Sequence, residues 1–483
     1  MMVQPGMSIP SRLLATFAAL SLALTAAAPD QWFRIATPHF EIYSSATDAN
    51  AAQKKSHDAL LALEDARRVI IDMAQSDWNQ AIPVRIISFQ SEKQYKPYAP
   101  NNGEASYSSN SQSRDYLVML ESDPDHLPIA LHQYVHLALQ HSGLKLPMWL
   151  SEGLAEVLTT EKPAGSDMLI GGVLKDHIEE LKTVKWIDFP SLTSANERSP
   201  YYNEGNRAGQ FYAESWALVH MLYLGRDYHA DFGKMLAALN DGKGAAEAWQ
   251  LAWGKSADRV YADLQAYVKQ NSLVATTFPA KRADAIDRAV ASPASDLDSG
   301  VMLADLLAAM NRKELATAAY DKLAKQYPGS PEIAKSLGYL AWQSGDDDSA
   351  RKYFEQALPG TRDPQMCYHL AMLYHDSGQG GDKLLATLTK AVSLKPDYGE
   401  ARLQLGLLEY NRRNYPGAIA ALAPIDQIAP ERAATLYNAL AYAYAETGDL
   451  SAARKALETG RKWNKTAAEK QRAEELARFL DSK

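Results

Sequence analysis

The chain has 483 residues, of which 46% are hydrophobic and 22% are charged, so it can bury a sizeable core and hold roughly two to four domains. Lysine and arginine number 50 against 58 aspartate and glutamate residues, and the formal net charge of −8 gives no electrostatic basis for nucleic-acid binding. The only cysteine is Cys367, which excludes an intramolecular disulfide.

The first 28 residues have the composition of a secretory signal. Arg12 precedes an apolar run from Leu13 to Ala28, which is shorter than the roughly twenty residues that a bilayer-spanning helix requires. The run ends in small residues from Thr25 onward, as signal cleavage requires. We therefore predict a signal peptide over residues 1–28 and a secreted or periplasmic protein without a stable membrane anchor. An uncleaved anchor is the alternative.

Residues 29–275 are predicted to form one α+β domain. Strand patterns come first, and helical spacing of the apolar residues takes over from Pro128 to about Gln270. We therefore expect a mixed sheet followed by helices. The predicted strands are Trp32–Ser44, Pro83–Phe89 and two within Tyr107–Leu120, with a helix over Thr47–Ala74.

The C-terminal part of the chain repeats with a period near 34 residues. Small residues of successive first helices lie 34, 33, 35 and 35 positions apart, a second small residue usually follows twelve positions later, and a large apolar residue four positions after that. The small residues let the two helices of a hairpin approach closely, and the large one is expected to fill the gap to the next hairpin. The three sets are Ala304, Gly338, Ala371, Gly406 and Ala441; Ala316, Ala350, Ala418 and Ala453; and Tyr320, Phe354, Leu422 and Leu457.

This pattern resembles the tetratricopeptide repeat at five successive positions, whereas an unrelated helical bundle gives no reason for a fixed period. The resemblance predicts an all-α solenoid over residues 298–483, capped by a helix over Lys465–Leu480, that binds a protein or peptide partner; a structural spacer is the alternative. One extra residue near Gly380-Gly381 predicts a late start for the second helix of the third unit. A linker is predicted over residues 276–297, which contain two Xaa-Pro pairs at Pro279 and Pro293.

A possible metal site lies between residues 127 and 158. His132 and His136 are four residues apart in a predicted helix, so both imidazoles lie on one face and can bind one zinc ion. Glu152, in the next predicted helix, supplies a third ligand, and two histidines with a glutamate form a known catalytic zinc set. Glu156 lies one turn further on the same face, where it can accept a ring N–H of either histidine.

The same segment resembles the gluzincin zinc peptidases, whose text reads HE-x-x-H followed by LP-x-WL-x-EGLAE. The match extends loosely to Trp32–Tyr43 and Phe211–His220, and its specific part covers His132, His136, Pro147, Trp149, Leu150, Glu152, Gly153, Leu154, Ala155 and Glu156. The resemblance implies a gluzincin-like peptidase fold, a bound zinc ion and an oxyanion-stabilising role for Tyr212. Ordinary aromatic packing is the alternative for Tyr212.

The sequence departs from the family at one decisive position, where Gln133 replaces the glutamate that follows the first histidine. In the family that carboxylate takes a proton from zinc-bound water, and an amide has no usable proton-accepting state. Glutamine is nearly isosteric with glutamate, so the pocket is expected to survive. We predict a zinc-binding protein with impaired peptidase chemistry whose repeats bind a partner. The alternative is an active zinc metallopeptidase of the cell envelope.

Overall fold

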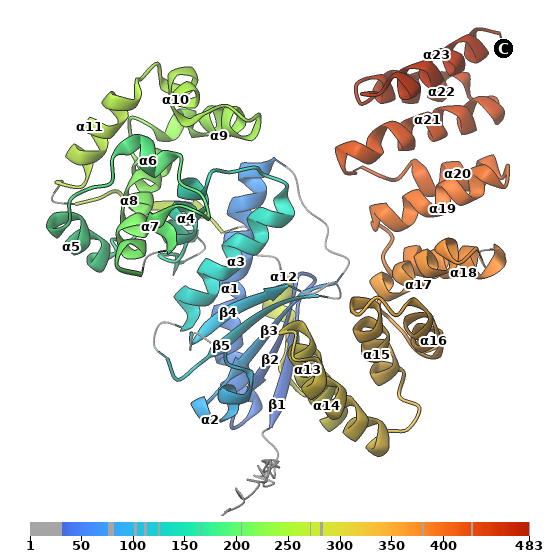
Figure 1. Ribbon diagram of the computed structural model, residues 1–483, viewed down its shortest axis with the longest axis horizontal. Coiled ribbons are helices and arrows are strands. Elements are labelled where there is room, and N and C mark those ends of the chain that lie inside the picture. Colours follow the sequence, from blue (N-terminus) through green and yellow to red (C-terminus); the bar gives the residue numbers. More distant parts are fainter. Residues whose placement is uncertain are drawn as a thin grey trace, which may run out of the picture.

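A computed structural model describes most of the chain from residue 31 onward (Figure 1). The predicted signal peptide over residues 1–28 lies outside the described residues. The described ranges are 31–75, 82–100, 104–110, 114–123, 126–165, 167–203, 205–270, 272–280, 284–378, 381–426 and 428–482.

The N-terminal part is built on a six-stranded sheet with the order β4-β5-β3-β2-β1-β9. Strands β2, β3 and β5 are parallel, whereas β1, β4 and β9 pair antiparallel, so the predicted mixed sheet is confirmed. The single strand predicted over Trp32–Ser44 is wrong in detail, because the chain reverses between β1 and β2. The strands are β1 Trp32–Ala36, β2 Phe40–Ser45, β3 Val84–Phe89, β4 Ser106–Asn110, β5 Asp115–Leu120 and β9 Ser292–Pro293.

Successive residues of the central strands point to opposite faces of this sheet, and both faces are buried. Ile42 and Ile86 face a core that they share with helices α1 (Ala49–Ala74) and α3 (His126–Ser142). Tyr43 and Ile87 face the other side, where α13 (Asp296–Ala309) covers them. Every residue of β2 and β3 is therefore buried, and apolar side chains occur on both faces of these strands, as burial on two faces requires.

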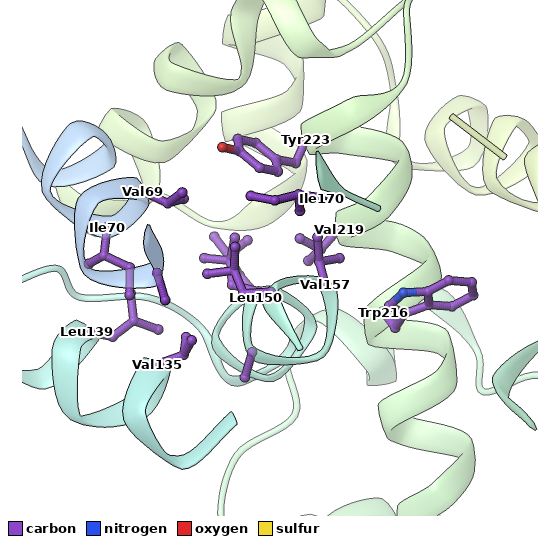
Figure 2. Packing of buried hydrophobic residues seen from close by; sticks show 14 of the residues in the cluster. Val69, Ile70, Val135, Leu139, Leu150, Val157, Ile170, Trp216, Val219 and Tyr223 are labelled. Carbon is purple, nitrogen blue, oxygen red and sulfur yellow. The ribbon is translucent and has the colours of Figure 1, made fainter. Parts of the chain in front are cut away.

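A helical layer follows the sheet, and its centre is the contact between α4 (Met148–Leu158) and α8 (Gly205–Leu224). A Cβ atom on Gly153 would lie 2.4 Å from the Ser215 carbonyl oxygen, so only glycine allows this approach. Figure 2 shows Leu150 and Val157 from α4 packed beside Val219. The remaining helices are α2 Glu92–Tyr95, α5 Lys175–Thr183, α6 Phe189–Thr193, α7 Pro200–Asn203, α9 Phe232–Asn240, α10 Ala245–Trp253, α11 Ala257–Tyr267 and α12 Asp284–Arg288, with 3₁₀ turns at Lys96–Tyr98 and His229–Asp231.

The segment predicted as a linker carries two short strands. Strand β8 (Thr276–Pro279) completes a three-stranded sheet with β6 (Lys162–Ala164) and β7 (Asp167–Ile170). Strand β9 pairs with β1 at the edge of the large sheet. Within residues 276–297, both described strands are thus hydrogen-bonded to the N-terminal part.

The C-terminal part is a stack of five helical hairpins and a final helix, which confirms the predicted repeat solenoid (Figure 1). The small residues of both sets are buried. Phe354 and Leu422 lie against Gly338 and Gly406 of their own hairpins, and each also belongs to a core cluster that includes residues of the next hairpin. The helices are α13 Asp296–Ala309, α14 Lys313–Gln326, α15 Pro331–Gln343, α16 Asp347–Ala357, α17 Pro364–Asp376, α18 Gly381–Leu394, α19 Gly399–Asn411, α20 Tyr415–Leu422, α21 Pro430–Glu446, α22 Leu450–Arg461 and α23 Ala467–Asp481.

In the four hairpins other than the third, the second helix begins nine residues after the small residue. The described part of helix α18 starts at Gly381, and residues 379–380, on which the predicted late start depends, lie outside the described residues. The terminal helix α23 carries a capping box between Thr466 and Glu469. Among the described helices, none has the length and apolarity needed to cross a membrane.

Candidate metal centre

Helices α3 and α4 bring the three predicted ligands together. His132 and His136 are one turn apart on α3, and Glu152 projects from α4. The two histidine Nε2 atoms are 3.1 Å apart, and the Glu152 Oε2 atom lies 3.2 Å from His136 Nε2 and 3.4 Å from His132 Nε2. All three residues thus offer a ligand atom to one point in space.

These distances fit a zinc ion. Ligand atoms about 2.05 Å from a tetrahedral zinc ion lie roughly 3.3 Å from one another, which matches the spacing of these three atoms. The donor set is two neutral imidazoles and one carboxylate, which leaves a fourth position for water or a ligand atom. His136 is the most exposed of the three side chains, at 30%, so the centre opens toward solvent on its side.

The second ring nitrogen of each histidine is also held. Glu156 Oε1 lies 3.2 Å from His132 Nδ1, which places Glu156 where the sequence analysis expected it. Ser151 Oγ lies 3.2 Å from His136 Nδ1. These contacts orient both rings so that their Nε2 atoms face Glu152, as metal-binding histidines generally require.

A third histidine contacts the carboxylate that holds His132. His177 Nε2, on α5, lies 3.1 Å from the second Glu156 oxygen, and its ring packs edge-on against Trp216. Neither His177 nor Ser151 was singled out by the sequence analysis. Ser151 adjoins Glu152, but nothing in the sequence indicates that its hydroxyl points toward α3. His177 is distant in sequence, and only the packing of α5 brings it close to Glu156.

The protonation of this cluster follows from its burial and its charges. Burial lowers the pKa of His132, but hydrogen bonds and charge from Glu152 and Glu156 outweigh it and raise the pKa to about 9. Burial raises the pKa values of both carboxyl groups, and their contacts with histidines outweigh this and lower each to about 2. The cluster therefore attracts positive charge, which a divalent cation would supply in place of the proton on His132.

Gln133 follows His132 on α3 and has a fixed neighbour. The hydroxyl of Ser108, on the edge strand β4, donates to Gln133 Oε1 over 3.0 Å. Tyr212 lies on α8 with its ring centroid 6.2 Å from that of His132, and equally 6.2 Å from that of Phe211. Its position therefore accommodates both the oxyanion role and the packing role.

Of the acidic residues that precede α3, Glu121 is engaged by other side chains. Glu121 accepts hydrogen bonds from Ser44 and Ser88 and pairs with Lys55, so it is engaged at the ends of the parallel strands. The Asp123 backbone carbonyl lies 2.5 Å from His126 Nδ1. Asp125 lies outside the described residues.

An open groove runs beside Glu152. One wall comes from Leu146–Met148, Ser151 and Glu152, and the other from Ala195–Arg198. Its volume is about 770 Å³, which is enough for several residues of an extended peptide.

Comparisons with known proteins bear on the repeats alone. Two family profiles described as tetratricopeptide repeat match residues 301–366 and 434–466. No curated protein matches the chain. Solved structures with similar folds include YrrB, described as a TPR protein with an unusual peptide-binding site, at 23% identity over 37% of this chain and 92% of that one, with a TM-score of 0.32.

Two further solved structures lie in the same range of similarity. MamA is 20% identical over 33% of this chain and 93% of its own, with a TM-score of 0.27. A thermophilic TPR protein of Thermus thermophilus is 20% identical over 38% of this chain and 98% of its own, with a TM-score of 0.22. The two family profiles and the helical period of about 34 residues assign the repeats. The C-terminal part of the chain consists of tetratricopeptide repeats.

Proposed function

We propose that this chain is an exported, zinc-binding protein built on a gluzincin-like peptidase domain, with peptidase chemistry impaired by Gln133 and with repeats that bind a protein or peptide partner. The observation that carries the proposal is the convergence of His132, His136 and Glu152, whose ligand atoms all lie within 4.8 Å of one another. Export rests on the apolar N-terminal run of the sequence, and gluzincin relationship on the motif around the three ligands.

A bound zinc ion would supply Lewis acidity and lower the pKa of a water at the fourth position. The protein's own residues then determine whether a peptide bond can be cut. His132 and His136 are held by Glu156 and Ser151, so the open position keeps a fixed direction. Gln133, tied to Ser108, cannot take a proton at any pH in the physiological range. The side chain at position 133 therefore cannot transfer a proton from the water to a leaving amine.

The surroundings suit a peptide that is held rather than cut. The groove beside Glu152 offers a path past the centre, and β4 is an edge strand among the described strands of its sheet, next to the Gln133 side chain. An extended segment can add to such an edge through backbone hydrogen bonds. The repeats supply a second, larger surface of the kind by which helical solenoids bind partners.

Active zinc peptidase is the second candidate function. The complete two-histidine, one-glutamate set and the placement of Tyr212 beside His132 favour it. The absence of a carboxylate at position 133 weighs against it, because general acid–base catalysis contributes typically about 10²–10⁴-fold.

Zinc stoichiometry and peptide cleavage test both candidates. We expect about one zinc ion per mature chain by elemental analysis, and its loss in His136→Ala. We expect cleavage of an unfolded protein substrate by Gln133→Glu alone, abolished by chelation. Gln140→Glu, which adds the same charge to an exposed position of α3, is the matched control and should stay inactive.

Two results would contradict the proposal in different ways. Brisk cleavage by the unaltered protein, lost in Gln133→Ala, would favour the active peptidase. Absence of zinc from both the unaltered protein and Gln133→Glu would remove the metal centre and leave the repeats as the functional part.

A further inference from the structure

The turn between the last two helices of the described stack carries a compact basic cluster. It joins α22 to α23, and Figure 1 shows both helices at the end of the stack remote from the sheet. Arg461, Lys462 and Lys465 are exposed, and the segment 461–465 contains no acidic residue. This segment therefore carries a charge of +3 in a chain whose formal net charge is −8.

No ion pair neutralises these three cations within the part of the chain that the structure describes. Neither Glu458, one turn earlier on α22, nor any other described carboxylate lies within ion-pair distance of Arg461, Lys462 or Lys465. Glu469, the first acidic residue after the turn, is engaged elsewhere, because its Oε2 accepts the backbone N–H groups of residues 465 and 466 over 2.9 and 2.8 Å. The three charged groups are thus left to solvent.

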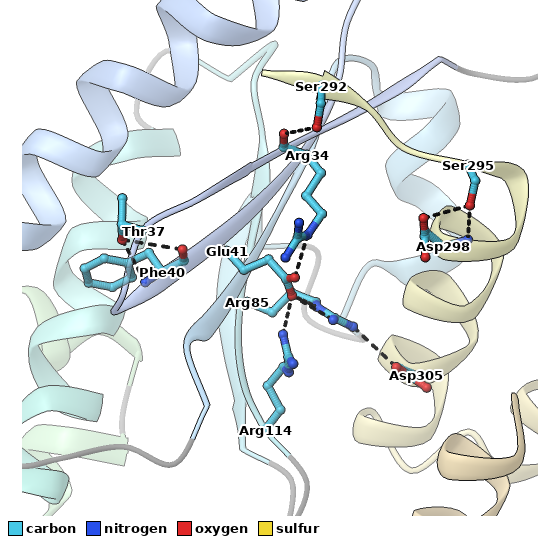
Figure 3. A network of polar contacts seen from close by, with 10 residues as sticks. All are labelled: Arg34, Thr37, Phe40, Glu41, Arg85, Arg114, Ser292, Ser295, Asp298 and Asp305. Atoms are coloured by element: carbon cyan, nitrogen blue, oxygen red, sulfur yellow. Dashed lines mark hydrogen bonds and ion pairs between the residues drawn. The ribbon is translucent and has the colours of Figure 1, made fainter. Parts of the chain in front are cut away.

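The main cluster of arginine in the N-terminal part is built differently. Arg34, Arg85 and Arg114 all pair with Glu41, and Arg85 also reaches Asp305 on α13 over 3.3 Å (Figure 3). Each of those cations therefore has a carboxylate partner and stabilises the contact between the sheet and the first repeat. The cations of the α22–α23 turn make no such internal contact.

The preceding turns between hairpins lack this excess of positive charge. Between α18 and α19, Lys395 pairs with Asp397 over 3.8 Å. Between α16 and α17, Arg362 is followed directly by Asp363, and the turn before α21 contains Asp426 and no cation. The turn between α14 and α15 carries no charge. The basic cluster is thus a property of this one turn and not of the repeat.

An exposed indole lies among the cations. Trp463 is 36% exposed, whereas most other large apolar side chains of the described residues are covered. The neighbouring Asn464 points inward, where its Oδ1 accepts a hydrogen bond from Asn438 Nδ2 over 3.4 Å. This contact fixes the turn so that Trp463 faces solvent between Lys462 and Lys465. Tryptophan has an apolar ring and a polar N–H, which suit the boundary between water and lipid.

The combination of cations and an indole limits what the turn can bind. A stable protein interface typically buries about 800 Å² on each partner, which a turn of this length cannot supply. A soluble polyanion matches the three cations but offers the indole no apolar layer. An anionic bilayer has charge at its surface and an apolar layer directly beneath, so it accommodates both kinds of side chain at once.

We propose that the α22–α23 turn is a reversible contact site for an anionic lipid bilayer. Arg461, Lys462 and Lys465 contact the headgroups, and the ring of Trp463 inserts between them. Each lysine or arginine near such a surface strengthens binding about 5-fold, so the three together contribute about 100-fold. The net charge of −8 repels the rest of the molecule from the bilayer, so the chain approaches with its last hairpin first.

Co-sedimentation with lipid vesicles tests the proposal. The chain of residues 29–483 is used, because the apolar run Leu13–Ala28 would itself bind lipid. Vesicles consist of phosphatidylcholine alone or with about 30% phosphatidylglycerol, and we expect the anionic vesicles to bind at least about 10-fold more tightly. We expect this preference at about 0.1 M salt and its loss at about 1 M salt, where attraction between charges is screened.

Two variants locate the contact. Lys462→Gln combined with Lys465→Gln removes two cations, and we expect about 25-fold weaker binding to the anionic vesicles. Trp463→Ser removes the indole and leaves the charge unchanged, and we expect about 5-fold weaker binding. Thermal unfolding verifies that each variant is folded.

Helix α14 of the first hairpin offers matched controls. Lys322 and Lys325 are exposed there, and the double change of both to glutamine removes the same charge away from the turn. Leu315 on the same helix is 56% exposed, so Leu315→Ser removes an exposed apolar side chain. We expect both controls to bind the anionic vesicles as the unaltered chain does.

Each remaining outcome counts against the inference. Equal binding to both kinds of vesicle would overturn recognition of an anionic surface. Equal losses in the turn variants and the α14 controls would show an effect of total charge and not a site. Undiminished binding by Trp463→Ser would favour a soluble polyanion, such as a nucleic acid or an acidic protein, over a bilayer. Zinc binding and peptide cleavage are measured separately, so failure here leaves the proposed metal centre untouched.

Discussion

At the scale of single residues, the proposed metal centre includes side chains that contact none of the three proposed ligands. His177 reaches Glu156, which in turn holds His132. We expect His177→Gln to weaken zinc binding up to about 10-fold, because it releases Glu156, and direct partners of metal-binding histidines such as Glu156 typically contribute about 10–100-fold. Competition with a chromophoric chelator measures the affinity. His141→Gln is the control, because His141 lies on α3 but pairs with Asp115; an equal loss in both variants would contradict a specific role for His177.

The buried side chain of Glu214 makes the stability of the protein depend on pH. The side chain is fully buried on α8, burial raises its pKa to about 7, and Oε2 has no hydrogen-bond partner among the described residues. The folded protein thus binds this proton more tightly than the unfolded chain, whose pKa is near 4.5. The resulting stability is complete below about pH 4.5 and is lost as the pH rises through 7.

Glu214→Gln removes this ionisation and keeps the oxygen that accepts the Ile187 N–H. Without zinc, the free energy of unfolding of the unaltered protein should decrease between pH 5 and 8 because Glu214 ionises. In the variant this contribution is absent, so we expect its decrease over the same range to be smaller by roughly 3 kcal/mol. Urea unfolding at pH 5, 6.5 and 8 measures the difference, with the exposed Glu179→Gln as control. Parallel pH profiles for Glu214→Gln and the unaltered protein would contradict the prediction.

At the scale of elements, local rules made most of the structure predictable. Two histidines four residues apart share a helix face whatever surrounds the helix, and Gly338 and Gly406 recur because a hairpin closes only where a small residue meets a large one. The features that could not be predicted from the sequence depend on contacts between distant segments. Ser151 and His177 are assigned only once α3, α4 and α5 are packed together.

The short strands show the same limit. Strand β9 is two residues long and contains Pro293, and β8 ends at Pro279, so both have the composition of a linker. Their pairing with β1 and β7 is set by the approach of those strands and not by any local preference. The boundary predicted over residues 276–297 thus describes composition and does not locate a free hinge.

At the scale of the whole molecule, the first repeat is part of the sheet domain. Met302 and Leu306 of α13 are buried against the face that carries Tyr43 and Ile87. We expect a chain of residues 31–295 to expose this face, to bind a hydrophobic dye and to unfold at lower temperature than a chain of residues 31–326, which keeps α13 and α14. Calorimetry and dye fluorescence compare the two; equal behaviour would show that the sheet needs no cover from the repeats.

Because α13 is at once a layer over the sheet and the first rung of the solenoid, the array leaves the N-terminal part in a single direction. A long client gripped along the array would then approach α3 from one side only. The number of repeats, and not the length of a flexible linker, would determine which segment of that client lies beside His136. Adding or deleting a whole hairpin would then shift, by a fixed distance, the segment of the client that lies beside His136.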